Sequence, residues 1–163
     1  MGIYLVDVSR ESWSAGQARA ELDRALAGRG LPPYPGPPAG LKDGDRFEEK
    51  VAPDMAAFAE LCDRHGATAV LEAGLFVPVA FDGLIELPVE TAYDDVTWAC
   101  SSHRLRELMR PLAAQVPAPT GPADGPMRLT AALADGDPVT FYVALFTRAA
   151  AFSLRHSCPM QYL

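Results

Sequence analysis

The stretch from Pro138 to His156 is the feature that most constrains the fold, because it predicts a helix that is apolar around most of its circumference. Asp137 followed by Pro138 is a typical helix start, with Asp as the N-cap and Pro in the first helical position. A helix that is apolar on nearly all sides has to be surrounded by other elements. We therefore expect it at the centre of the molecule, buried through its apolar side chains: Phe141, Tyr142, Val143, Leu145, Phe146, Ala149 and Phe152.

Helical and strand patterns alternate through the rest of the chain. Residues 3–8 are a short run of β formers, and apolar residues recur at helical spacing over 14–28, over 53–65 and from Ser101 or Ser102 onwards. A shorter helix is expected over 127–134, and residues 68–89 form an apolar section rich in β formers. These patterns predict an α+β fold in which four to five helices pack on a small, mainly antiparallel sheet.

A β-hairpin is expected around Asp82-Gly83. This dipeptide lies between two apolar runs, and it is a strong short-range hairpin signal because both residues tolerate the positive φ that the turn needs. The implied register places Phe81 opposite Leu84. Prolines near both ends of the two runs indicate edge strands, since proline cannot donate a ladder hydrogen bond.

The chain length of 163 residues predicts one domain over residues 1–163. Two proline-rich connectors interrupt it, at 31–40 and at 117–126. Proline removes a backbone donor and fixes φ, so neither connector is expected to form a helix interior or a central strand.

The composition predicts a soluble cytoplasmic protein. A net charge of −7 makes nucleic-acid binding a poor fit, because phosphate backbones are bound by clustered Lys and Arg. No apolar run approaches membrane-spanning length, and the N-terminus lacks the pattern of a signal peptide. Three cysteines cannot form a complete set of disulfides, which fits a reducing compartment. Abundant Arg, Ala, Pro and Gly with few Lys indicate a GC-rich bacterial genome.

An acidic stretch with aromatic neighbours follows the expected hairpin. Acidic charge accelerates encounter with a basic target, and aromatic side chains supply contact energy at interfaces. This pattern favours a non-enzymatic, inhibitor-like or immunity-like module that binds a basic protein partner. The predicted partner-binding residues are Glu86, Glu90, Tyr93, Asp94, Asp95 and Trp98.

Each of the three cysteines has one of the three histidines close beside it along the chain. Cys and His are zinc ligands, and pairs spaced two or three residues apart can converge on one ion. A thiol before a helix start can also have a lowered pKa, which makes Cys100, with His103 as base, a candidate nucleophile. The alternative hypothesis is therefore a small zinc-dependent or cysteine-dependent enzyme that uses Cys62 and His65, Cys100 and His103, and His156 and Cys158.

No complete catalytic set accompanies these pairs, so no catalytic residue is predicted and the binding hypothesis is preferred. No glycine-rich phosphate loop is present in the sequence, and zinc is the one cofactor under consideration. The sequence identifies neither the partner nor the oligomeric state.

Overall fold

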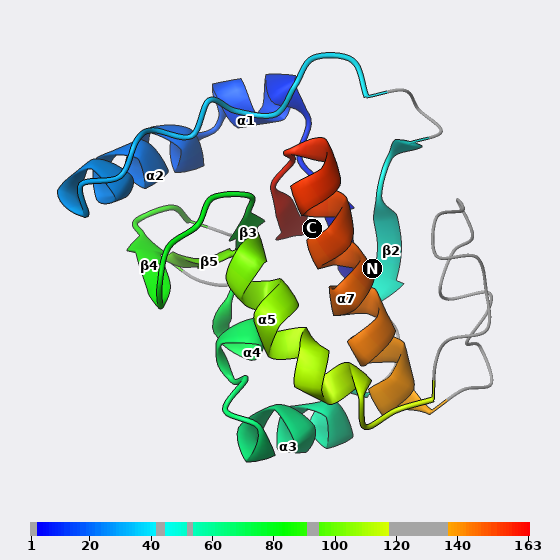
Figure 1. The fold of residues 1–163 in the computed structure, drawn as a ribbon. Coiled ribbons are helices and arrows are strands. Elements are labelled where there is room, and N and C mark those ends of the chain that lie inside the picture. The colour runs from blue at the N-terminus through cyan, green and yellow to red at the C-terminus, as the bar shows by residue number, and fades with distance from the viewer. Residues whose placement is uncertain (1–2, 42–44, 52–53, 91–94, 118–136) are drawn as a thin grey trace.

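The computed structural model describes residues 3–41, 45–51, 54–90, 95–117 and 137–163. Within these residues the chain forms six helices and six strands (Figure 1). The helices are α1 (Arg10–Ala15), α2 (Gln17–Gly28), α3 (Ala56–Arg64), α4 (Ala69–Glu72), α5 (Ser102–Ala113) and α7 (Pro138–His156). The strands are β1 (Ile3–Asp7), β2 (Glu48–Val51), β3 (Leu75–Val77), β4 (Leu84–Leu87), β5 (Thr97–Ser101) and β6 (Met160–Tyr162).

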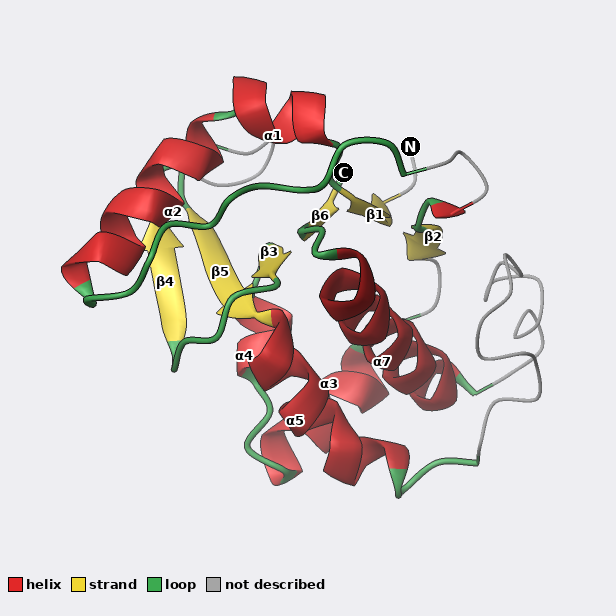
Figure 2. Ribbon diagram, turned by 45° about the horizontal axis from the view of Figure 1, so that its top comes forward, coloured by secondary structure: helices red, strands yellow, loops and turns green. Residues whose placement is uncertain are grey.

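The six strands form one mixed sheet in the order β2-β1-β6-β3-β5-β4 (Figure 2). Strands β3 and β5 pair in parallel, and the other four pairings are antiparallel. It follows that β1, β3 and β5 all point in one direction. The α+β class is confirmed, with a sheet of mixed pairing.

The sheet separates two hydrophobic clusters, as the alternation along β3 shows. Phe76 belongs to a cluster that also contains residues of α3, α5 and α7, whereas Leu75 and Val77 belong to a second cluster with residues of α1 and α2. Successive side chains of a strand point to opposite faces, so helices cover both faces of the sheet (Figure 1).

Helix α7 occupies the larger cluster, as its apolar circumference predicts. Asp137 caps it by accepting from the backbone N–H of Thr140 at 3.1 Å, and Pro138 is the first helical residue. Phe146 of α7 packs against Phe58 of α3 and Phe76 of β3, with ring centroids 5.5 and 5.9 Å away. Helix α5 lies alongside α7 (Figures 1 and 2). Helix α7 is therefore surrounded by α3, α5 and the sheet.

The expected hairpin at Asp82-Gly83 does not form. Strand β5 lies between β3 and β4, so the two runs do not pair directly. Gly83 has a φ of 70°, but Asp82 does not adopt positive φ, which excludes the two-residue turn that the register required. The predicted opposition of Phe81 and Leu84 was therefore wrong, because Leu84 faces Cys100 instead.

Two further sequence expectations differ in detail. The single helix expected over 14–28 is two helices, α1 and α2, and Gly16 with extended backbone separates them. The section expected to be β-rich from residue 68 begins with the short helix α4. The short helix expected over 127–134, and nearly all of the connector at 117–126, lie outside the described residues.

The proline-rich connector at 31–40 forms no helix or strand and is pinned to the body at two of its residues. Tyr34 and Pro37 are buried, while most of the other prolines are exposed. The Tyr34 hydroxyl donates to the backbone carbonyl of Ser157, and the Tyr34 ring meets the Trp13 ring edge-on at 5.4 Å. Gly36, with a φ of 88°, lies so close to Trp13 that a Cβ at this position would be 3.3 Å from the Trp13 ring. None of the described helices is both long and apolar enough to cross a bilayer.

Candidate partner-binding site

Two of the predicted partner-binding residues face each other across the outermost strand pair. Glu86 of β4 lies directly opposite Trp98 of β5 in an antiparallel register. Side chains in this relation have Cβ atoms about 5 Å apart and form one continuous surface. Strand β4 has β5 as its one strand neighbour among the described residues, so this surface lies at an edge of the sheet.

Trp98 is neither a core residue nor a fully exposed one. Side chains alternate along strands, so Glu86 and Trp98 share the sheet face of Leu84 and Cys100. Cys100 is completely buried in the larger cluster, whereas Trp98 is half-buried and belongs to neither cluster. A half-exposed tryptophan beside an exposed carboxylate is the kind of anchor that protein interfaces use.

Two more of the predicted acidic residues lie in the loop that follows Glu86 and precedes Trp98. Glu90 and Asp95 are both exposed, and they lie in the connection between β4 and β5. The Thr97 hydroxyl donates to the carbonyl of Val89 at 3.1 Å, which ties the two ends of that connection together. Tyr93 and Asp94, the other two predicted contact residues, lie outside the described residues.

A helix over 53–65, as the sequence predicts, would place Cys62 and His65 on one face, but the structure gives the two side chains different environments. Cys62 is completely buried in the larger cluster, and His65 is exposed. His65 is the C-cap of α3, with φ −106° and ψ 7°, so it has left the helical geometry on which the expectation depended. The expectation of a shared face was therefore wrong.

Cys100 and His103 lie on either side of the junction between β5 and α5. Cys100 is completely buried in the core, where its thiol contacts the carbonyl of Ser101 at 3.6 Å. His103 is half-buried and lines a surface cleft. The sequence predicts a helix that opens at Ser101 or Ser102. Ser101 is the N-cap of α5 and accepts from the backbone N–H of His103 and of Arg104.

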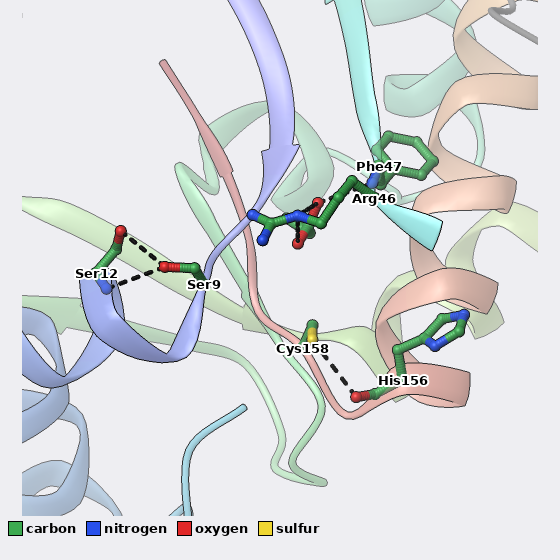
Figure 3. Close-up of polar contacts among 7 residues, drawn as sticks. Ser9, Ser12, Arg46, Phe47, His156 and Cys158 are labelled. Atoms are coloured by element: carbon green, nitrogen blue, oxygen red, sulfur yellow. Dashed lines mark hydrogen bonds and ion pairs between the residues drawn. The ribbon is translucent and has the colours of Figure 1, made fainter. Parts of the chain in front are cut away.

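His156 and Cys158 also diverge. The Cys158 thiol contacts the backbone carbonyl of His156 at 3.4 Å, while the imidazole points away from the thiol (Figure 3). That imidazole packs instead against the Phe152 ring, 4.4 Å between centroids. Ser157 between them has a φ of 52°, and this left-handed residue reverses the chain at the end of α7.

A buried hydrogen-bond chain connects the second and third of these pairs. The Ser102 and Ser153 hydroxyls lie 2.7 Å apart, and Ser153 donates to the carbonyl of Cys158 at 2.7 Å. Both serines are completely buried. This hydrogen-bond chain joins the start of α5 to the end of α7, so Ser102, Ser153 and Cys158 have a structural role in the fold.

Burial raises the pKa of all three thiols to about 11. Arg104 lowers the pKa of Cys100 in part, but burial is the larger effect, which is the opposite of the expected activation. Thiols with such pKa values are protonated at neutral pH, and thiolate is both the nucleophile and the metal-binding form. In the described part of the chain, which contains every Cys and His, no three His, Cys, Asp or Glu side chains gather as a metal site would require.

The structure also contains a buried acid that sequence reasoning missed. Asp7 at the end of β1 has 4% of its surface exposed and accepts from the backbone N–H of Phe47 at 2.7 Å. Arg46 Nε lies 2.9 Å from its Oδ2 and 3.2 Å from its Oδ1, and only the Oδ1 contact has hydrogen-bond geometry. Figure 3 shows Arg46 and Phe47 beside the start of β2. This pair attaches the segment before β2 to β1.

A cleft of about 450 Å³ lies at the other end of the β4–β5 pair from Trp98. It is lined by Arg29, Leu31, Ala80, Phe81, Asp82, Ser101, His103, Arg104 and Glu107. These residues come from segments far apart in the sequence, so no local motif could have indicated the cleft.

No family model, curated protein or solved structure matches this chain. The function therefore has to be argued from the side chains themselves.

Proposed function

We propose that this protein is a non-enzymatic binding module that captures a basic protein partner. The binding surface, here called the acidic–aromatic face, comprises Glu86, Glu90, Asp95 and Trp98. Tyr93 and Asp94, outside the described residues, are predicted from the sequence alone to contribute to binding. The observation that carries the proposal is the direct opposition of Glu86 and Trp98 on the outermost strand pair. It puts an aromatic contact and a negative charge on one exposed patch.

Charge complementarity identifies the class of partner. The chain carries a net charge of −7, and Glu86, Glu90 and Asp95 are all exposed. Such a surface attracts a basic partner over distances of about a Debye length, roughly 8 Å at physiological salt. It repels acidic surfaces and nucleic acid. Trp98 then supplies apolar contact area that charge alone does not give.

The enzyme hypothesis has less support from the geometry. The three thiols are buried and their pKa values are raised to about 11, so none is prepared to act as a nucleophile or a zinc ligand at neutral pH. Each histidine of the three pairs also lies in a different environment from its cysteine: one exposed, one in a cleft and one on a phenylalanine ring.

The test compares two variants of the acidic–aromatic face with a matched control. The protein is immobilised, a partner is captured from an extract of its own cells, and the affinity of the purified partner is then measured. Trp98→Ala should raise Kd at least about 30-fold, the effect of losing an interface hot spot. Glu86→Lys should raise Kd about tenfold, mainly through slower association, and the effect should shrink at high salt.

Glu48→Lys is the control, because Glu48 is exposed on β2 at the opposite edge of the sheet and the substitution changes the net charge equally. It should change Kd less than about twofold. Thermal unfolding of each variant checks that the fold survives. A captured partner that binds Trp98→Ala and Glu86→Lys as tightly as the unmodified protein would remove this proposal.

A further inference from the structure

The cleft beside α5 is formed where two parallel strands end. Strands β3 and β5 are neighbours that run in the same direction. The cleft is lined by Ala80 and Phe81 after β3, by Ser101 at the end of β5 and by His103 just after it. Crevices outside the carboxyl ends of parallel strands are common ligand sites in sheets covered by helices. A volume of about 450 Å³ is within the range of small-molecule pockets and much larger than a simple ion needs.

Arg29 is held in this cleft by three separate contacts. Its Nη1 donates to the carbonyl of Asp82 at 2.7 Å, and its Nη2 donates to the carbonyl of Leu84 at 3.2 Å. Its guanidinium also lies over the Phe81 ring, 5.8 Å from the centroid. A guanidinium has five N–H donors, so donors remain for a ligand after these two bonds are made. Because these contacts already hold Arg29 in place, the Arg29 side chain would lose little further conformational entropy when a ligand binds.

The first turn of α5 brings more positive charge to the same cleft. His103 and Arg104 both line it, and the first turn of α5 contains no acidic residue. The partial positive charge at a helix start favours Asp and Glu there and disfavours cations. Helix stability therefore does not account for Arg104 at this position, whereas a bound anion would be favoured by Arg104 and by the helix start.

The cleft is lined by two arginines and by two carboxylates, Asp82 and Glu107, but Arg29 forms no ion pair with a described residue. Arg104 Nη1 contacts Glu107 at 3.4 Å, in an exposed pair of the kind that contributes little to stability, and Asp82 is exposed at the rim. No described residue hydrogen-bonds the His103 imidazole. Leu31 supplies half-buried apolar surface beside these polar groups, and Phe81, which is 8% exposed, adds a small part.

We propose that this cleft binds a small organic anion, a carboxylate or phosphate monoester that carries an apolar or aromatic group. Arg29 and Arg104 hold the anionic group near the start of α5, and the apolar group lies on Leu31 and on the part of Phe81 that is exposed. The cleft and the acidic–aromatic face lie at opposite ends of the β4–β5 pair, so the two proposals stand or fall separately.

Calorimetric titration with four probes tests this site in the intact chain. Phenyl phosphate and benzoate are the anionic aromatic probes, benzyl alcohol is the neutral match, and inorganic phosphate is the match without an apolar group. At least one aromatic anion should bind with Kd below about 1 mM and at least about tenfold more tightly than benzyl alcohol and inorganic phosphate. The stronger of phenyl phosphate and benzoate identifies the anionic group.

Variants locate the binding. Arg104→Gln should raise Kd about tenfold, whereas Arg106→Gln, an exposed residue of the same helix that does not line the cleft, should change it less than about twofold. Glu107→Gln should lower Kd, because it releases Arg104 from its ion pair. Arg29→Gln should weaken binding as Arg104→Gln does, and Arg104→Gln remains informative if Arg29→Gln unfolds the protein.

Three results would overturn the proposal. The first is that neither aromatic anion binds, and the second is that benzyl alcohol binds as tightly as they do. The third is that Arg104→Gln and Arg106→Gln have equal effects, which would place the anion elsewhere on the surface.

Discussion

Replacing Ser153 with Ala should destabilise the fold more than replacing Ser153 and Ser102 together. A hydroxyl has one hydrogen, and that of Ser153 is donated to the carbonyl of Cys158. Ser102 must therefore be the donor in the 2.7 Å contact between the two serines. Ser153→Ala removes the partner of the Ser102 hydroxyl and of the Cys158 carbonyl at once.

The magnitudes follow from the number of buried groups that each variant leaves without a partner. Each such group costs roughly 1–3 kcal/mol, while a satisfied hydrogen bond contributes about 1 kcal/mol net. Ser102→Ala leaves Ser153 bonded to Cys158, so it should cost about 1 kcal/mol. Ser153→Ala leaves two groups unpaired and should cost about 3 kcal/mol. The double variant leaves one group unpaired and should recover about 1 kcal/mol of that loss.

Equilibrium unfolding in urea measures these differences, provided that the slope with denaturant is the same for all four proteins. A recovery of about 1 kcal/mol corresponds to a rise in Tm of about 2–4 °C for a chain of this size. The Ser9 and Ser12 hydroxyls lie 3.0 Å apart at the start of α1 and provide the control, because Ser12 is exposed and Ser9 only half-buried (Figure 3). Ser12→Ala should cost less than about 0.5 kcal/mol, because water replaces the lost partner.

A double variant that is less stable than Ser153→Ala would refute this reasoning. It would mean that the Ser102 hydroxyl finds another partner, or that water enters between α5 and α7 once Ser153 is lost. Either result would show that the junction of the two helices is less tightly closed than the complete burial of both serines implies.

Two other predictions concern the thiols and a glycine. Burial raises the thiol pKa values from 9.0 to about 11, so between these pH values the unfolded thiols lose protons that the folded ones keep. The free energy of unfolding should therefore fall as pH rises from about 9 to about 11. Cys62→Val should make this decline less steep. An unchanged slope for Cys62→Val would contradict it. Gly36→Ala should destabilise the protein about 1 kcal/mol more than Gly40→Ala, and thermal unfolding measures the difference. Both glycines have positive φ, but only at Gly36 would a Cβ lie 3.3 Å from Trp13. Equal losses would show that the Trp13 ring moves aside.

Elements with strong local signals could be predicted from the sequence. The bounds of α7 follow from Asp137, Pro138 and an apolar run that ends at His156, and the start of α5 follows from Ser101. Both depend on capping and helical periodicity within a few residues. The class of fold follows from these elements together.

Pairings between distant segments could not be predicted in this way. The hairpin at Asp82-Gly83 was expected because its turn signal is local, but β5 pairs with both β3 and β4 and separates them. Spacing along the chain also does not determine direction in space. Cys62 and His65 are three residues apart, yet one lies in the core and the other in solvent, because the helix ends between them.

The candidate sites differ in the same respect. Glu86 and Trp98 are close enough in the sequence for composition to suggest a shared surface, although their direct opposition is a property of the sheet. The anion cleft unites Arg29, Phe81 and Arg104, which share no spacing or motif, so only the folded arrangement identifies it.

The position of β6 has a consequence for how this chain can be made. Residues 160–162 form the strand that joins β1 and β2 on one side to β3, β5 and β4 on the other. Ribosomes deliver the chain from its amino end, so the two parts of the sheet have no bridge until β6 has been synthesised. In nascent chains β1 and β3 would each have an unpaired edge that could pair with the wrong strand. The last of the described strands to emerge is thus the one that makes the sheet whole.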